Sequence, residues 1–172
     1  MILGNEAIIK AFNSPTGWGF NNVSVLEKKK VQPASVDLKL DNWFVCPSTN
    51  MIWSGGCIDD PFILKPQMMI LARTMESVWL SPFLAAQVGT RSSAMRQGID
   101  VCMSAGWIDP GYSGHITLEI TNHSNKPVTL KAGESYCQIV LMQVIGCTEP
   151  YRGKYGGPQQ DESDMMSKGV EK

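Results

Sequence analysis

The stretch from residue 91 to residue 119 reads RSSAMRQGIDVCMSAGWIDPGYSGHITLE, and it decides how the rest of the chain is interpreted. It opens with a basic and hydroxyl-rich segment that contains Arg91, Ser92, Ser93 and Arg96. This segment has a short helical pattern, and Gly98 can end the helix in a left-handed conformation. The N-terminus of a helix presents free N–H groups, and hydroxyl and guanidinium groups beside it suit a phosphate chain. The segment therefore predicts an anion site.

The second half of the stretch predicts a tight turn followed by a strand. The turn covers Asp109–Gly114, and the strand covers His115–Thr121. Apolar residues alternate with polar ones along this strand, so Glu119 is expected on the face away from the core. The stretch thus combines an anion site with two carboxylates, Asp109 on the turn and Glu119 on the strand.

Short apolar runs with turn residues between them recur along the rest of the chain. Runs typical of strands cover residues 36–40, 62–64, 68–74, 78–80, 128–130 and 136–144. Helical patterns are limited to residues 5–12, to the segment after Arg91 and to residues 83–87, where Ser81 and Pro82 provide a helix start. This arrangement predicts an all-β fold with a few short helices, and a sandwich or a barrel-like jelly roll fits it.

Composition indicates a globular domain without a nucleic-acid or membrane partner. Of the 172 residues, 43% are hydrophobic and 18% are charged, which is typical of one folded domain. The net charge of −1 argues against a general nucleic-acid or membrane-surface binder, since such proteins carry a clear positive excess. The sequence has neither an apolar run long enough for a membrane span nor a secretory signal pattern, so we expect a cytoplasmic protein.

The five cysteines indicate reduced thiols rather than disulfides or a zinc site. Their number is odd, and no two of them are close in sequence. Zinc sites in proteins commonly contain a Cys-x-x-Cys pair and a further His or Cys. No such pair occurs here, and the only histidines are His115 and His123. The sequence therefore predicts no zinc site of this kind.

Several motifs in a fixed order resemble the dCTP deaminases, which share a fold with the trimeric dUTPases. The motifs are Gln32–Leu40 (QPASVDLKL), Arg91–Arg96 (RSSAMR), Ala105–Glu119 (AGWIDPGYSGHITLE) and Ala132–Leu141 (AGESYCQIVL). Several ordered motifs are far more specific than one glycine pattern. The resemblance implies a distorted jelly roll or β-barrel of the dUTPase-like fold, assembled as a homotrimer with sites between subunits. It implies one nucleotide-hydrolysing domain over residues 1–150 and a flexible lid and tail over residues 151–172.

The resemblance implies hydrolytic deamination of dCTP to dUTP and ammonia, without zinc. Glu119 matches the catalytic Glu of the family, which acts as general base and then as general acid, and such a carboxyl needs a raised pKa. Ser92 and Arg96 match the positions that orient the water and the carboxylate. Asp109 matches the Asp with which dUTPases position a water for attack on the α-phosphate. The residues that precede Asp109 are closer to the sequence of the bifunctional dCTP deaminase–dUTPases than to that of single-function deaminases. A second step to dUMP and pyrophosphate is therefore expected.

The resemblance also assigns substrate contacts. The matching positions are Arg91, Ser93, Ala105, Trp107, Tyr112, Gln138, Tyr151, Lys154, Tyr155 and Gln159. Mg²⁺ is expected to bind through the nucleotide triphosphate, with no direct protein ligand and with Asp37 acting through water. The expected small-molecule partners are dCTP, dUTP and dTTP, the last as a feedback inhibitor.

Cys102 departs from the family pattern, because these deaminases commonly have His at this position. The departure leaves two alternatives open: altered regulation by dTTP, and a modified cytosine in the substrate. Two further alternatives are a dUTP diphosphatase without deaminase activity and a non-catalytic nucleotide-binding protein that keeps the fold. A dUTP diphosphatase without deaminase activity is disfavoured by Ser92, Arg96 and Glu119, since a dUTPase has no need of this set. The retained carboxylates and basic residues argue against a non-catalytic nucleotide-binding protein.

Overall fold

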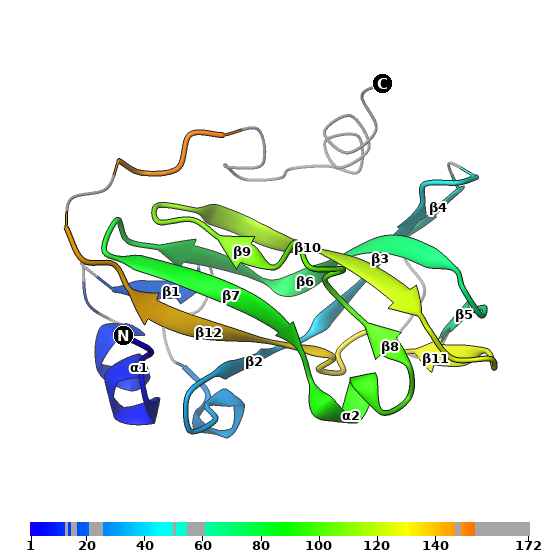
Figure 1. Cartoon of the computed structure of the whole chain (residues 1–172), viewed down its shortest axis with the longest axis horizontal. Helices are drawn as coiled ribbons and strands as arrows, with labels where there is room; N and C mark the ends of the chain where they lie inside the picture. Colours follow the sequence, from blue (N-terminus) through cyan, green and yellow to red (C-terminus); the bar gives the residue numbers. More distant parts are fainter. Residues whose placement is uncertain are drawn as a thin grey trace.

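The computed structural model describes residues 1–12, 14, 17–20, 26–49, 51–54, 61–146 and 149–153, and within these ranges the chain is mostly β (Figure 1). The strands are β1 (Trp18–Phe20), β2 (Val36–Leu38), β3 (Leu40–Cys46), β4 (Met51–Ser54), β5 (Phe62–Leu64), β6 (Met69–Leu80), β7 (Leu84–Thr90), β8 (Ile99–Asp100), β9 (Trp107–Ile108), β10 (Ser113–Asn122), β11 (Val128–Leu130) and β12 (Cys137–Gln143). The helical pieces are α1 (Asn5–Phe12), the 3₁₀ turn η1 (Lys28–Lys30) and α2 (Ser92–Met95). The prediction of an all-β fold with a few short helices is confirmed. No helix in the described ranges is long and apolar enough to cross a membrane.

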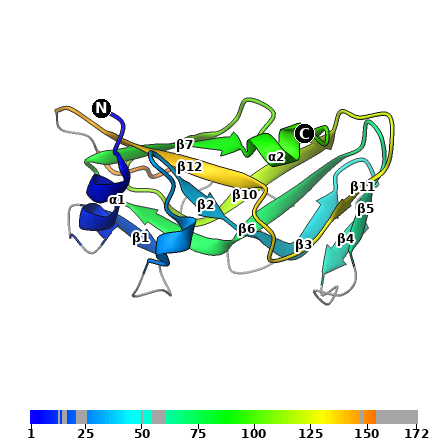
Figure 2. The same ribbon diagram turned by 90° about the horizontal axis from the view of Figure 1, so that it is seen from below.

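Two antiparallel sheets form the main layers of the fold. One has the strand order β4-β3-β6-β10-β8, with β1 also paired to β6, and the other has the order β2-β12-β7-β9. β5 and β11 form a separate two-stranded sheet. In Figure 2, β7 and β12 make up the upper layer, while β1, β6 and β3 make up the lower layer. The core lies between these layers.

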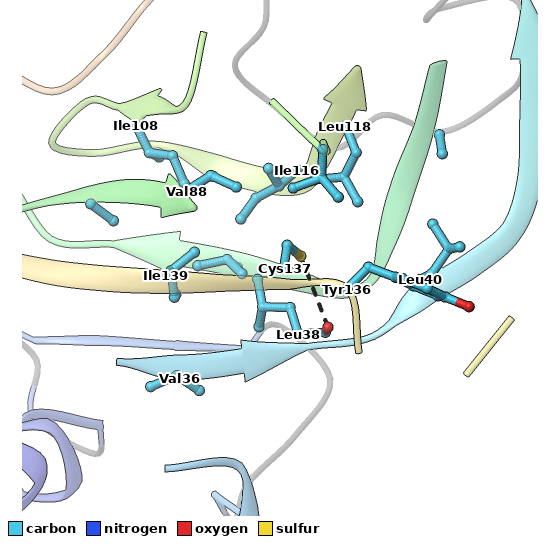
Figure 3. Close-up of a cluster of buried hydrophobic side chains, with 14 of the residues drawn as sticks. Val36, Leu38, Leu40, Val88, Ile108, Ile116, Leu118, Tyr136, Cys137 and Ile139 are labelled. Carbon is cyan, nitrogen blue, oxygen red and sulfur yellow. Dashed lines mark hydrogen bonds between the residues drawn. The ribbon is translucent and has the colours of Figure 1, made fainter. Parts of the chain in front are cut away.

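The core is built by alternation along the strands. In β6 and β10 the inward-facing side chains are buried, and nearly all of the intervening ones are only partly covered. Figure 3 shows side chains from β2, β7, β9, β10 and β12 that point toward one another, and Leu38, Leu118 and Ile139 among them are fully buried. Burying one such side chain stabilises the fold by about 1.5–3 kcal/mol, so the register of β10 is strongly specified. This register directs Glu119 away from the core, as the sequence predicts.

The predicted helical turn at residues 83–87 is wrong, because β7 begins there. Ser81 and Pro82 form a chain-reversing turn instead, in which the Leu84 N–H donates to the Ser81 carbonyl oxygen at 3.1 Å. The Phe83 N–H also donates to the Ser81 hydroxyl, at 3.3 Å. From Leu84 onward the chain pairs with β12 along the whole length of β7. β7 lies between β12 and β9 in the sheet. Pairing with these two strands overrides the local helix preference of residues 83–87, which is weak.

The two apolar runs at residues 68–74 and 78–80 form one long strand, β6. Residues 65–67, which separate the runs 62–64 and 68–74, form a turn before it, and Gln67 has a φ of 60° there. β5 precedes this turn but pairs with β11 rather than with β6. The predicted division after residue 150 into a domain and a tail stays a prediction, since the described residues end at 153.

Candidate active site

The basic and hydroxyl-rich segment forms a single helical turn after β7. α2 covers only Ser92–Met95, and Gly98 follows it with a φ of +83°, as the sequence predicts. Ser92, Ser93 and Arg96 are exposed, whereas the Ala94 side chain packs into the core. The side chains that were expected to bind an anion or to orient water therefore face solvent in the single chain.

Asp37, Arg91 and Gln138 gather at neighbouring strands of the four-stranded sheet, and we call them the Arg91 cluster. Gln138 of β12 lies opposite Asp37 of β2 and opposite Gly89 of β7. Nη2 of Arg91 lies 3.2 Å from Oδ2 of Asp37, and Nη1 donates to the Ser135 carbonyl oxygen at 3.1 Å. The cluster thus joins two predicted phosphate-binding residues to the Asp of the first motif.

Asp37 is the buried charge of the Arg91 cluster. Only 6% of the residue is exposed, and Oδ1 has no hydrogen-bond partner among the described residues. Oδ2 accepts a hydrogen bond from Nε2 of Gln32 at 3.2 Å. Burial raises the pKa of Asp37, and the charge of Arg91 and the Gln32 hydrogen bond act against this.

The unpartnered oxygen of Asp37 bears on the expected Mg²⁺. A buried acceptor without a donor is costly, and a water bound to Mg²⁺ supplies such a donor. No group of three or more His, Cys, Asp or Glu suited to a metal occurs in the described part of the chain. The water-mediated role of Asp37 toward a nucleotide-bound Mg²⁺ stays a prediction.

Glu119 lies within β10, opposite Leu71 of β6 and on the face away from the core. Its side chain is half-buried. Its pKa is raised, mainly because burial disfavours the charged form, and the negative charge of Asp100 raises it further. A backbone hydrogen bond acts in the opposite direction. The pKa of Glu119 thus departs from the ordinary Glu value in the direction that the sequence analysis expects of this residue.

The segment Cys102–Ala105, which we call the Cys102 turn, begins close to Glu119. Burial raises the pKa of the Cys102 thiol, and the charges of Asp100 and Glu119 add to the increase. Met103 and Ser104 have φ values of 36° and 75°, a left-handed backbone that costs about 1 kcal/mol or more per residue. The Ala105 N–H donates to the Cys102 carbonyl oxygen at 2.6 Å. The segment is therefore a tight turn, and the charge of Glu119 contributes to the raised pKa of its first side chain, Cys102.

The turn that carries Asp109 contacts the start of the C-terminal segment. Nε1 of Trp107 donates to Oδ1 of Asp109 at 2.9 Å, and both residues are exposed. The rings of Tyr112 and Tyr151 lie 6.4 Å apart between centroids. The Tyr151 N–H donates to the Pro110 carbonyl oxygen at 2.8 Å. The predicted lid thus begins at the turn that holds Asp109.

Apart from Ser92, Ser93 and Arg96, which are exposed at α2, the described site residues fall into three groups in one chain. These are the Arg91 cluster, Glu119 with the Cys102 turn, and Asp109 with Trp107, Tyr112 and Tyr151. Among the described residues, no hydrogen bond or ion pair joins Glu119 to Ser92, Arg96 or Asp109. Lys154, Tyr155 and Gln159 lie outside the described residues.

Three polar residues of these groups were not singled out from the sequence. Gln32 bonds to Asp37, and the Ser35 hydroxyl donates to Oε1 of Gln138 at 2.8 Å. Both lie in the first motif, so the resemblance of that motif could have identified them as site residues. Asp100 belongs to none of the four motifs, and only the pairing of β8 with β10 places it near Glu119.

Known proteins provide a consistent comparison. A family model described as dCTP deaminase-like matches residues 2–144. A protein of Sulfurihydrogenibium sp. (strain YO3AOP1) named "dCTP deaminase, dUMP-forming" is 35% identical over 171 residues of the match. The match covers 91% of this chain and 92% of that protein.

Solved structures share the fold. The 2'-deoxycytidine 5'-triphosphate deaminase from Agrobacterium tumefaciens matches with a TM-score of 0.63 at 23% identity, over 81% of this chain and 47% of that chain. The EIAV dUTPase matches with a TM-score of 0.52 at 18% identity, over 78% of this chain and 93% of that chain. These matches confirm the predicted dUTPase-like fold. Together with the family model, which spans well over half of the sequence, they lead to one conclusion: this chain belongs to the dCTP deaminase-like family.

Proposed function

We propose that this protein hydrolyses dCTP to dUTP and ammonia without zinc and then converts dUTP to dUMP and pyrophosphate. The observation that carries the proposal is the half-buried Glu119, with its raised pKa, inside the region matched by the family model. The name of the Sulfurihydrogenibium relative, a dUMP-forming dCTP deaminase, supports the second step. The Arg91 cluster and Asp109 supply groups for the phosphate chain.

Glu119 is the proton carrier of the deamination. Its carboxylate takes a proton from the attacking water while the water oxygen bonds to C4 of cytosine, and it passes this proton to N3. It then takes the remaining hydroxyl proton and delivers it to the amino group, so that ammonia leaves and the C4 carbonyl forms. The raised pKa favours this sequence, because a carboxyl with a pKa nearer to neutral both accepts and donates protons readily.

Ser92 and Arg96 act on Glu119 from a neighbouring subunit of a homotrimer. Both are exposed in one chain, and neither bonds to Glu119 within the part that the structure describes. A subunit interface would remove them from water, where a guanidinium orients a carboxylate strongly.

Mixed trimers test the shared site. When Ser92→Ala chains and Glu119→Gln chains are refolded together, some interfaces hold both native residues. We expect deaminase activity to return in the mixture, and two inactive parents with an inactive mixture would place both residues in one subunit.

The Arg91 cluster and Ser93 bind the triphosphate. Arg91 supplies positive charge, and Gln138 supplies an amide beside it. Mg²⁺ bound to the nucleotide neutralises phosphate charge, and Asp37 acts on this ion through a water.

Asp109 positions the water that attacks the α-phosphorus of dUTP, which releases dUMP and pyrophosphate. The Trp107 indole fixes one oxygen of this carboxylate at 2.9 Å, which limits its orientations. Tyr112 packs beside the deoxyribose, and Ala105 contacts the exocyclic group of the base. The lid contributes Tyr151, Lys154, Tyr155 and Gln159.

Product analysis after incubation with dCTP and Mg²⁺ tests the proposal. We expect ammonia and dUMP in equal amounts, without accumulation of dUTP. Accumulating dUTP would restrict the function to deamination, and dUMP formed from dUTP but not from dCTP would leave a dUTP diphosphatase. Parallel assays with dTTP and with base-modified dCTP test what Cys102 changes in regulation or in substrate choice.

A further inference from the structure

Asp100 is a carboxylate near Glu119 for which the proposed reaction gives no role. It ends β8 and lies directly opposite Thr121 of β10. Glu119 precedes Thr121 by two positions, so it occupies the adjacent site on the same face of β10. Oγ1 of Thr121 is buried and has no hydrogen-bond partner among the described residues. Asp100, Thr121 and Glu119 therefore line one polar strip of the sheet.

The carboxylate of Asp100 connects two segments of the site. Its Oδ1 accepts hydrogen bonds from the Thr90 hydroxyl at 2.7 Å, from the Val101 N–H at 2.8 Å and from the Cys102 N–H at 3.4 Å. The Thr90 hydroxyl oxygen also accepts a hydrogen bond from the Val101 N–H at 3.1 Å, so Thr90 contacts the residue that follows β8. Thr90 immediately precedes Arg91, and Cys102 begins the Cys102 turn. One oxygen thus holds the end of β7 and the Cys102 turn together.

The charge of Asp100 lies near three other titratable groups: Glu119, Cys102 and His123. It raises the pKa of Glu119 in addition to the larger effect of burial, and it has the same effect on the Cys102 thiol. Nε2 of His123 lies 4.0 Å from Oδ2 of Asp100, so protonated His123 would partly offset this charge.

We infer that Asp100 is a positioning residue for deamination: its carboxylate fixes the Cys102 turn against the segment that begins with Arg91, and its negative charge acts on Glu119. The inference rests on the proposed role of Glu119 and extends it. Asp100 does not touch the reacting atoms in this account. It fixes the geometry on the base side and adds to the proton affinity of Glu119, which burial raises most.

The variant Asp100→Asn separates charge from geometry, because the amide keeps an oxygen acceptor and loses the charge. We expect the acid limb of the deamination pH profile to move to lower pH, since removing a nearby negative charge lowers the pKa of Glu119. The KM for dCTP should stay within about threefold of wild type. Thr90→Val is the matched control: it removes one tether and keeps the charge, so KM should rise about fivefold with an unchanged pH profile.

A titration of the Glu119 carboxyl by NMR, in the nucleotide-free protein, provides a readout that needs no turnover. Glu119 should ionise at lower pH in Asp100→Asn than in wild type. An identical titration and an identical pH profile would overturn the inference while leaving the proposed function intact. Failure of wild type to release ammonia from dCTP would overturn the proposed function instead. If Asp100→Asn did not fold, an unchanged KM in Thr90→Val would overturn the tethering role.

Discussion

Burial raises the pKa of both Asp37 and Glu119, but the charged neighbours of these two carboxylates differ in sign. Asp37 is almost completely buried, and a guanidinium lies 3.2 Å from it. Glu119, on the other large sheet, is half-buried and faces the like charge of Asp100. A paired charge suits lasting contact with a charged ligand, whereas a carboxyl beside a like charge suits proton transfer. In the proposed function the two sheets divide phosphate binding from proton chemistry, and this division can be tested at each side.

The largest expected effect comes from Glu119→Gln. Deamination should fall by roughly 10³-fold, because an amide cannot carry the proton from water to N3 and to ammonia. Binding of dCTP, measured by calorimetry, should stay close to wild type, since the Arg91 cluster is unchanged. Ammonia release at the wild-type rate would refute the assignment of Glu119.

The next effect separates the two chemical steps. In Asp109→Asn, hydrolysis of dUTP should fall by about 10²-fold while ammonia release continues, so dUTP accumulates. Chromatography of the nucleotides over time measures the ratio of dUTP to dUMP. If dUMP still formed at the wild-type rate, Asp109 would be a structural turn residue only.

A smaller effect is expected from Arg91→Ala, which leaves Asp37 buried without its cation. Unfolding free energy should fall by about 2 kcal/mol, less than for a fully buried pair because the Arg91 side chain is 35% exposed. The KM for dCTP should rise by about tenfold or more. Adding Asp37→Asn should recover part of the stability but not the KM, because the unpaired charge is gone while the phosphate contact is still missing.

Lys30→Ala provides the control for that variant. Lys30 pairs with Glu76, and the two side chains are 13% and 6% exposed. Both lie outside the three groups of the site. Urea unfolding should show a loss of stability comparable to that of Arg91→Ala, without a change in KM. A similar rise in KM in both variants would mean that lost stability, not lost contact, weakens binding.

The smallest effect concerns stability and pH. The pKa of Glu119 is raised in the folded state, so the folded chain binds this proton more tightly than the unfolded chain does. Ionisation therefore lowers the stability of wild type as pH rises above the ordinary Glu pKa, and the loss is complete above the raised pKa. Glu119→Gln should be more stable than wild type at neutral pH, and urea midpoints over a pH series should converge at low pH. A constant difference across the series would contradict the raised pKa.

Local sequence patterns were sufficient where one strand face or one turn determines the structure. Alternation in β10 placed Glu119 on the correct face, and Gly98 ended α2 with the left-handed φ that a non-glycine residue adopts only at a cost. The first and fourth motifs contain Asp37 and Gln138, which face each other across β2 and β12. In each case the relevant neighbours are close in sequence or belong to a recognisable motif.

The failures have a common origin in long-range pairing. Residues 83–87 carry a local helix start, yet pairing with β12 makes them a strand. Asp100 belongs to none of the four motifs, and it reaches Glu119 only because β8 adds to the edge of β10. Neither outcome is encoded within a few residues of the position concerned.

The sequence by itself determined the all-β class, the family motifs and the residue types that the proposed chemistry needs. The tertiary structure alone decided which charged groups become neighbours: Arg91 pairs with Asp37, and the charge of Asp100 acts on Glu119. The physical reason is that periodicity specifies which face of a strand a side chain occupies, whereas pairing between distant strands specifies its neighbours. Proton affinity depends on those neighbours and on burial, so the raised pKa of Glu119 is a property of the folded chain.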